Sequence, residues 1–441
     1  MHRTIIRGAL KRGVLVLAVA VTGPFVATAG GALAGVATPP ALSFSGAQAI
    51  ASPQGATMTF RARLSAASTS PVAVEYATKN GTAVAGTDYV STSGTLVLAA
   101  GSTSGSVEVT LLPVALGAGG SDKTFSLELS HPSGASLSTP SVTGTIHPDV
   151  YVASSTSAFQ NVVINPSSTT AYLTVPGKNE VAVLNLRTGT YGKPIPVGSD
   201  PHGIDITPDG KTLYVCDSGG QTISKVDTAT RTVTTITTPP GLLNDTPYSI
   251  AIMNNGNALY STTFAGSGFG ANVYNLNLTT DASTVVTAIS PVTEATPLSR
   301  SADYSTVGAV LGDDSGGPFD IYTAATGNVV SGSLNNFISS SSLNGNGSTV
   351  LVDGRYVIDA ATGSLLGTIS DSCGSSALTA LGTTGYCLEA QSIVRLRIKR
   401  FLTGKAIALP QPAGGGAQLA LSDNGRVLVA ETSGGATIVE L

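Results

Sequence analysis

Side chains that could perform catalysis or bind a metal are scarce in this chain of 441 residues. The sequence holds four histidines and three cysteines, and it has no tryptophan. His202 is the only histidine after residue 149, and one imidazole cannot supply the three histidines of a common catalytic zinc site. We interpret His202 as a turn residue beside Pro201. The sequence therefore predicts no catalytic residue and no cofactor-binding residue.

The three cysteines allow one disulfide. Cys373 and Cys387 lie close together in sequence, whereas Cys216 ends the apolar run Leu213–Cys216. An odd count leaves at least one thiol unpaired. We favour a Cys373–Cys387 bridge with Cys216 as a buried apolar residue, and three free thiols remain the alternative.

One cluster of basic residues stands out near the C-terminus. Arg395, Arg397 and Lys399 alternate with apolar residues, and Arg400 follows. This alternation places the three cations on one face of a strand. We interpret that face as solvated, and a small patch for an anionic polymer is the alternative.

The N-terminal segment has the three parts of a secretory signal peptide. Four basic residues come first, then an apolar stretch over 14–21, then small residues with exits at Ala29 and Ala34. We predict a signal peptide at residues 1–34, and an uncleaved membrane anchor is the alternative. The signal peptide is preferred because the apolar stretch is short for a membrane span. The protein is then expected to be secreted, as an extracellular or cell-envelope protein, with no later transmembrane segment.

Charge and composition narrow the classes of partner. The chain has 22 Lys+Arg and 26 Asp+Glu, a formal net charge of −4, and 42% hydrophobic residues. An acidic chain without a long basic run does not resemble a nucleic-acid-binding protein. The hydrophobic fraction is sufficient for a packed core.

Two kinds of β-structure must position any functional residue. The sequence after residue 34 has no long pattern of helical period. It has short runs in which apolar and polar residues alternate, separated by turn residues, as is typical of β-strands. Residues 41–148 contain about seven such runs, of which 58–64 and 125–129 are examples. One face of each run is apolar and the other polar, which predicts an all-β fold beginning with an immunoglobulin-like sandwich.

Residues 40–148 resemble the Calx-beta family. The resemblance rests on the segment Val74-Glu75-Tyr76-Ala77-Thr78-Lys79-Asn80-Gly81-Thr82-Ala83, on Ala85-Gly86-Thr87-Asp88-Tyr89, and on the later Thr124-Phe125 strand. It implies a sandwich that acts as a spacer or an adhesive domain.

The same resemblance implies a candidate calcium site. Some members of the family bind Ca²⁺ through clustered carboxylates at one end of the sandwich, and hard cations need six to eight oxygens. Asp88 matches the acidic residue of the family's turn and Asp149 falls near its terminal acidic run, but the other acidic positions are absent. Asp88 and Asp149 are therefore weak Ca²⁺ candidates, and a turn-capping role for Asp88 is the alternative.

From residue 149 onward the chain repeats itself. The clearest unit contains the turn Pro208-Asp209-Gly210-Lys211 followed by Leu213-Tyr214-Val215. We place seven such units at intervals of 38 to 48 residues; they centre on Ser168, Gly210, Gly256, Tyr304, Gly347, Gly385 and Gly425. Four strands per unit at this period indicate a seven-bladed β-propeller over residues 149–441. The last unit lacks one strand, which residues 149–153 are expected to supply.

This segment resembles the YVTN-type propellers, which are common in surface-layer proteins. The resemblance rests on the Pro208–Lys211 turn and the strand after it, where Cys216-Asp217 departs from the family's usual Thr-Asn. It implies a rigid platform for recognition at the cell surface.

We therefore predict a non-enzymatic, monomeric binding or adhesion protein whose partner is an envelope or extracellular protein or polymer. A propeller-type hydrolase or lyase is the first alternative, and Ca²⁺-dependent adhesion is the second. The lining of the central channel distinguishes the first two. Three or more convergent His, Asp or Glu side chains favour the enzyme, and an apolar or Ser/Thr lining favours the binder.

Overall fold

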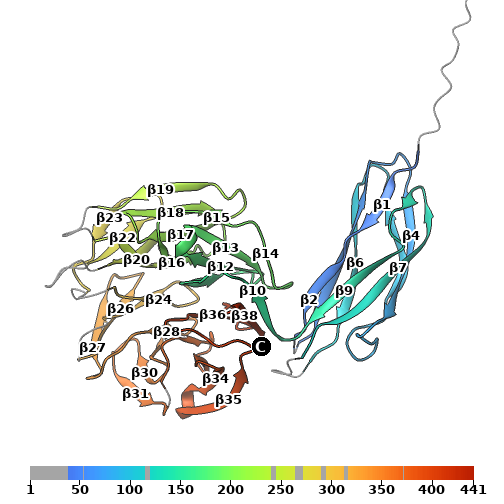
Figure 1. Ribbon diagram of the computed structural model, residues 1–441. Helices are drawn as coiled ribbons and strands as arrows, with labels where there is room; N and C mark the ends of the chain where they lie inside the picture. Colours follow the sequence, from blue (N-terminus) through green and yellow to red (C-terminus); the bar gives the residue numbers. More distant parts are fainter. Residues whose placement is uncertain are drawn as a thin grey trace, which may run out of the picture. The chain divides into compact units, whose positions relative to one another are not determined.

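The computed structural model describes the chain from residue 38 onward, with short gaps (Figure 1). The described residues are 38–52, 54–114, 120–239, 245–263, 272–289, 295–311, 316–370 and 372–441. The signal peptide predicted at residues 1–34 lies outside them. No helix in this part of the chain is long and apolar enough to cross a membrane.

The N-terminal domain is a sandwich of two β-sheets. One sheet has the strand order β6-β3-β1-β8 and the other β2-β9-β7-β4-β5. Their bounds are β1 Ala41–Phe44, β2 Ala47–Ile50, β3 Ala56–Leu64, β4 Val72–Asn80, β5 Ser93–Leu98, β6 Ser104–Leu111, β7 Lys123–Ser133, β8 Ser136–Leu137 and β9 Ser141–His147.

Alternation along each strand builds the core of the sandwich. In β3, Met58, Phe60 and Ala62 are fully buried, whereas Arg61 between them is exposed. The opposite sheet contributes Phe125, whose ring stacks on Tyr89 with centroids 4.3 Å apart. Because successive side chains of a strand point to opposite faces, this pattern buries one face of each sheet and leaves the other to solvent.

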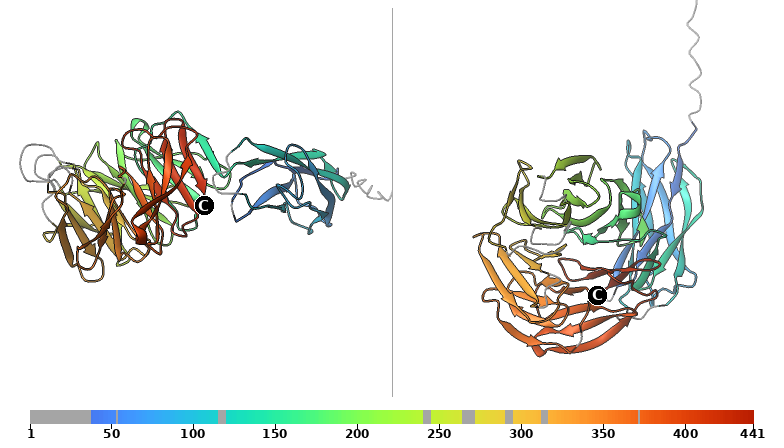
Figure 2. Two further views of the ribbon diagram at one scale, coloured as in Figure 1. Left: turned by 90° about the horizontal axis from the view of Figure 1, so that it is seen from below. Right: turned by 60° about the vertical axis from the view of Figure 1, so that its left-hand side comes forward.

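The second domain is a ring of seven sheets, the blades of a β-propeller (Figure 2). Blade one holds β11 Val162–Ile164, β12 Thr170–Val175, β13 Glu180–Asn185, β14 Thr190–Tyr191 and β15 Ile195–Pro196; blade two holds β16 Pro201–Ile206, β17 Thr212–Asp217, β18 Thr222–Asp227 and β19 Val233–Thr237; blade three holds β20 Pro247–Ile252, β21 Asn257–Thr262, β22 Val273–Asn277 and β23 Ser283–Val285; blade four holds β24 Leu298–Arg300, β25 Thr306–Val310, β26 Pro318–Thr323 and β27 Val329–Ser333.

The remaining blades follow the same order. Blade five holds β28 Ser341–Leu343, β29 Thr349–Val352, β30 Tyr356–Asp359 and β31 Leu365–Thr368; blade six holds β32 Ser376–Leu378, β33 Thr384–Leu388, β34 Ser392–Arg397 and β35 Leu402–Ala408; blade seven holds β36 Leu419–Leu421, β37 Val427–Thr432, β38 Gly435–Glu440 and β10 Val150–Ser154. The predicted all-β fold class, a sandwich followed by a seven-bladed propeller, is confirmed.

Blade seven closes the ring with both ends of the propeller segment. β10 pairs antiparallel with β38, from Val150 opposite Val439 to Ser154 opposite Gly435. The strand that the last unit lacks thus comes from the residues just after the sandwich. This pairing removes an open sheet edge between the first and last blades.

The repeat is visible in the first turn of every blade, where one residue has positive φ. These seven residues are Ser168, Gly210, Gly256, Tyr304, Gly347, Gly382 and Gly425, with φ from 56° to 81°. The sequence-based position in blade six was wrong, because Gly385 lies inside β33 and Gly382 makes the turn. Gly382 donates to the carbonyl of Thr379, just as Gly210 donates to that of Thr207.

The cysteines lie inside the propeller. Cys373 and Cys387 form a disulfide with Cα atoms 5.8 Å apart, and Cys216 is free and buried. This is the pairing that the sequence favours. Burial raises the pKa of the Cys216 thiol, and the neighbouring Asp217 adds to the effect, so the group stays neutral.

Candidate functional site

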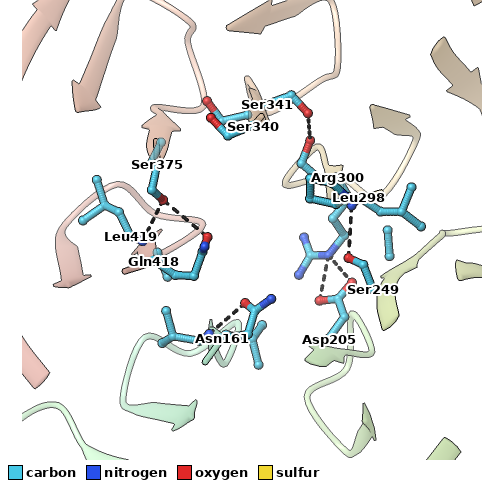
Figure 3. Close-up of a pocket in the computed structure, with 18 of the residues that line it drawn as sticks. Asn161, Asp205, Ser249, Leu298, Arg300, Ser340, Ser341, Ser375, Gln418 and Leu419 are labelled. Atoms are coloured by element: carbon cyan, nitrogen blue, oxygen red, sulfur yellow. Dashed lines mark hydrogen bonds and ion pairs between the residues drawn. The ribbon is translucent and has the colours of Figure 1, made fainter. Parts of the chain in front are cut away.

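The innermost strands of the seven blades surround a cavity of about 280 Å³ at the centre of the ring, here called the channel cavity (Figure 3). Each blade contributes residues at or next to its first strand, such as Asn161 from blade one, Asp205 from blade two and Gln418 from blade seven. Its size lies near the lower end of the range for small-molecule pockets. The cavity is therefore large enough for a ligand of a few heavy atoms or a single sugar ring.

A buried ion pair crosses part of this cavity. Nε of Arg300 lies 2.8 and 3.0 Å from the two carboxylate oxygens of Asp205, and both side chains are about nine-tenths buried. Asp205 also accepts from the backbone N–H groups of Ile206 at 2.8 Å and Ile252 at 2.7 Å. Three N–H groups therefore donate to this carboxylate, with the Nε–H of Arg300 shared between both oxygens, which disfavours Asp205 as a general base.

The rest of the Arg300 guanidinium is held by its own blade. Its Cζ atom lies 3.6 Å from the centroid of the Tyr304 ring, and Nη2 donates to the Tyr304 hydroxyl at 3.0 Å. Nη1 donates to the carbonyl of Ser301 at 3.2 Å. Burial alone would lower the pKa of Arg300, but Asp205 outweighs it and raises the pKa. In Figure 3 the terminal nitrogens point toward the open middle of the cavity.

Blade four departs from the repeat at these two positions. Four residues before the turn residue, the other six blades carry Ile or Leu, whereas blade four has Arg300. At the turn itself five blades have glycine and blade one has serine, whereas blade four has Tyr304 with φ 61°. A bulky residue with positive φ is strained, and such strain concentrates at functional sites. The departure from the repeat therefore marks the Arg300–Tyr304 pair as the feature specific to this propeller.

Serine hydroxyls and amide side chains supply most of the other polar groups of the wall, beside apolar residues of the inner strands. Ser299 and Ser341 share a hydrogen bond of 2.6 Å between blades four and five. Ser375 of blade six accepts from the Leu419 backbone N–H at 2.9 Å and donates to the side-chain carbonyl of Gln418 at 3.5 Å. These contacts join neighbouring blades, and each hydroxyl retains a further hydrogen-bonding site. The lining is therefore polar and mostly uncharged.

Two further ionisable groups reach the cavity. Asp423 lies 4.0 Å from Nη1 of Arg300, and burial raises its pKa although Arg300 opposes the effect. His202 lies in β16, so its interpretation as a turn residue was wrong; Asp200, with φ 51°, makes the bend. Nε2 of His202 lies 3.5 Å from Asp200, and its ring centroid is 5.4 Å from that of Tyr248. Among the described residues, no three His, Cys, Asp or Glu side chains form a metal-binding group.

The two calcium candidates lie outside the channel cavity. Asp88 accepts from Lys123 Nζ at 2.6 Å and from the Val84 backbone N–H at 2.8 Å. Burial alone would raise the pKa of Asp88, but these two donors outweigh it and hold the pKa below its usual value. Asp149 follows β9 and is 1% exposed. The ammonium of Lys123 already neutralises the carboxylate that a cation would need, which disfavours the predicted calcium site at Asp88.

Sequence reasoning missed the most distinctive feature of the site. Arg300 and Asp205 are 95 residues apart and belong to no motif. A signal was present, because an arginine stands where every other repeat has an aliphatic residue, and because Asp205 interrupts an apolar strand. An alignment of the seven repeats on their turn residues would have found both.

Comparison with known families and structures supports this architecture. Residues 38–149 match the Calx-beta domain family. The sandwich is therefore a Calx-beta domain, and the following part of the chain is a β-propeller. No curated protein sequence matches the chain; the assignment to the YVTN type stays a prediction.

Three solved propellers illustrate the likeness of the second domain. They are "Kuenenia stuttgartiensis Hydrazine Synthase" (TM-score 0.54, 15% identity, covering 65% of this chain and 96% of that chain), U3-55K (0.53, 13%, 66% and 98%) and the Cps50 (Swd1) β-propeller domain of Myceliophteria thermophila (0.51, 12%, 65% and 98%). At such low identity the likeness shows the fold alone.

Proposed function

We propose that the protein is an exported, non-enzymatic binding protein of the cell surface. The propeller acts as the interaction platform, the Calx-beta domain as a spacer or adhesive module, and the channel cavity takes a small neutral ligand rich in hydroxyl groups, such as one unit of a saccharide. Calx-beta and propeller domains are both compatible with binding or adhesion.

The proposal rests on the small net charge and the many neutral polar groups of the channel cavity. Arg300 and Asp205 neutralise one another, and Asp423, whose pKa burial raises, lies beside the same guanidinium. Most of the other donors and acceptors are serine hydroxyls and the amides of Gln160, Asn161 and Gln418, which suit hydroxyl groups rather than ions; His202 and Tyr248 complete the set. The two terminal nitrogens of Arg300 supply fixed donors at the centre.

Export is supported by two independent features. The first is the basic, apolar and small-residue order of residues 1–34, and the second is the Cys373–Cys387 disulfide. Disulfides persist in oxidising compartments outside the cytosol. Fractionation of the native host, with mass spectrometry of the mature N-terminus, would test export and distinguish Ala29 from Ala34 as the cleavage site.

A propeller-type hydrolase or lyase remains the competing function. It would require His202 or Asp423 to act as a base, since hydrogen bonds occupy Asp205. His202 stands alone as an imidazole among the cavity residues, with Asp200 as its polar neighbour. The wall of hydroxyls therefore fits a binder better than an enzyme.

Ligand-observed NMR with the purified protein tests the site. The probes are glucose, N-acetylglucosamine and galacturonic acid. We expect binding of a neutral sugar, with loss of at least tenfold in affinity in Gln418→Leu. Gln411→Leu is the matched control, because Gln411 is exposed on the chain before blade seven and outside the cavity. Equal binding by both variants, or conversion of the sugar during the experiment, would contradict the proposal.

A further inference from the structure

Blade six carries a basic surface that the channel cavity does not involve. Five cations lie within residues 395–405, and no acidic residue occurs from 390 to 422, although the whole chain has a net charge of −4. All five side chains are exposed. They are Arg395, Arg397, Lys399, Arg400 and Lys405, and we call them the basic strip.

The local fold explains why these side chains face solvent. Val394, Leu396 and Ile398 are buried in the blade core, so Arg395 and Arg397 between them project outward from β34. The sequence-based strand was too long at this point, because a 3-10 turn over Ile398–Arg400 follows β34. That turn, which ends at Phe401 with φ 53°, presents Lys399 and Arg400 beside the strand rather than along it.

Nothing within the described chain neutralises this charge. None of the five cations forms an ion pair with a described carboxylate, although several other lysines and arginines do. Four of them, together with Thr383, line an open groove of about 400 Å³. A groove of one sign attracts a partner of the opposite sign.

We infer that the basic strip binds a linear polyol phosphate, a polymer whose phosphodiester groups are joined by three-carbon units. Arg395 and Arg397 are two residues apart on a strand, so their side chains leave the backbone about 7 Å apart. Six backbone bonds separate successive phosphorus atoms of such a polymer, as many as separate the Cα atoms of residues two apart in a peptide. Successive phosphates of the extended polymer are therefore also about 7 Å apart. Each guanidinium can then hold two oxygens of one phosphate.

The surroundings disfavour single-stranded nucleic acid, which has similar phosphate spacing. Recognition of unpaired bases depends on exposed aromatic rings on which they stack. The aromatic residues nearest in sequence are engaged elsewhere. Phe401 packs against the blade-six core and crowds Gly367, and Tyr386 is 5% exposed. The strip thus offers charge without a stacking platform.

The test is titration of the purified full chain with short unbranched poly(glycerol phosphate), followed by calorimetry at several salt concentrations. Arg395→Gln/Arg397→Gln/Lys399→Gln should weaken binding about 30-fold, at roughly threefold for each exposed ion pair. The slope of log affinity against log salt should become less negative by about 2, at about 0.7 per phosphate contact.

A matched triple variant controls for net charge. Lys178→Gln/Lys193→Gln/Lys211→Gln also removes three positive charges, from exposed positions on blades one and two, and should bind as the unmodified protein does. Circular dichroism melting of both variants shows that each is folded. Equal weakening in the two triple variants, or absence of binding by the unmodified protein, would overturn the inference. So would tighter binding of oligothymidylate or polygalacturonate than of the polyol phosphate. Gln418→Leu should leave this binding unchanged, which separates the strip from the channel cavity.

Discussion

The carboxyl group of Glu431 should make the stability of the propeller depend on pH. Glu431 lies in β37 and is 5% exposed. One oxygen accepts from the backbone N–H of Gln418 at 3.0 Å, and the other has no partner among the described residues. Burial raises the pKa of Glu431 to about 7, although the Gln418 N–H opposes it. Glu431 is therefore a buried acid that contacts the backbone of Gln418, a residue of the channel cavity, and only one of its two oxygens has a hydrogen-bond partner among the described residues.

The sign and size of the effect follow from linkage. The folded state holds this proton more tightly than the unfolded chain does, so the contribution of Glu431 is fully present below about pH 4.5 and is lost as pH rises through about 7. At 1.36 kcal/mol per pKa unit, the loss between pH 5 and pH 8 is about 2–3 kcal/mol. Glu431→Gln keeps an acceptor for Gln418 and cannot ionise, so the variant should lack this loss.

Urea unfolding of the propeller transition at pH 5 and pH 8 measures the effect. The difference in unfolding free energy between Glu431→Gln and the unmodified protein should shift by about 2–3 kcal/mol in favour of the variant at pH 8. Other titrating groups cancel in this comparison. Glu180→Gln, in the half-buried first position of β13, serves as the control. A difference that is equal at the two pH values, or one that favours the unmodified protein at pH 8, would refute the reasoning.

Three further outcomes can be measured on the same protein. Arg300→Met should lower the free energy of unfolding by about 3–5 kcal/mol in urea titrations, because it leaves the buried Asp205 carboxylate without its cation. Reduction of the disulfide, or Cys373→Ser/Cys387→Ser, should cost about 3 kcal/mol, since the bridge closes a short loop, and thermal melting with and without reductant checks this. Millimolar Ca²⁺ should produce no heat in calorimetry of the full chain and no shift in melting temperature, because Lys123 already pairs with Asp88; a clear calcium isotherm would contradict this assignment.

The sequence predicted the architecture well because repetition averages out local ambiguity. Gly210, Gly256 and Gly425 mark turns that require positive φ, and the strands around them follow at a nearly constant interval. The error at Gly385 arose in a blade where the turn glycine, Gly382, lies three residues earlier and both glycines match the pattern. Register within one repeat is set by the geometry of the turn, and the spacing of the repeats alone does not reveal which glycine makes that turn.

The candidate site was harder to predict because it depends on contacts between blades. His202 follows a proline and a positive-φ aspartate, which suggests a turn, yet Thr174 of the preceding blade donates to its carbonyl at 2.9 Å and it extends the inner strand. Asp205 appears as an isolated acid within an apolar strand until Arg300 is placed beside it. Only the closed ring brings these two segments together.

The difference between blade four and the other six blades bears on the proposed function. Seven similar blades give a rigid wall, because serine and aspartate side chains bond several neighbouring inner strands to one another, as Ser299 does to Ser341. A symmetric wall alone would recognise little, since every direction across the channel would present the same groups. Arg300 and Tyr304 break that symmetry in blade four, and the strain of a positive-φ tyrosine is balanced by its contact with the guanidinium. Substitution of Tyr304 by the glycine found in five of the other repeats would relieve the strain but remove one hydrogen bond and the ring contact that fix Arg300, so the recognition proposed for the cavity would depend on the one blade that departs most from the repeat.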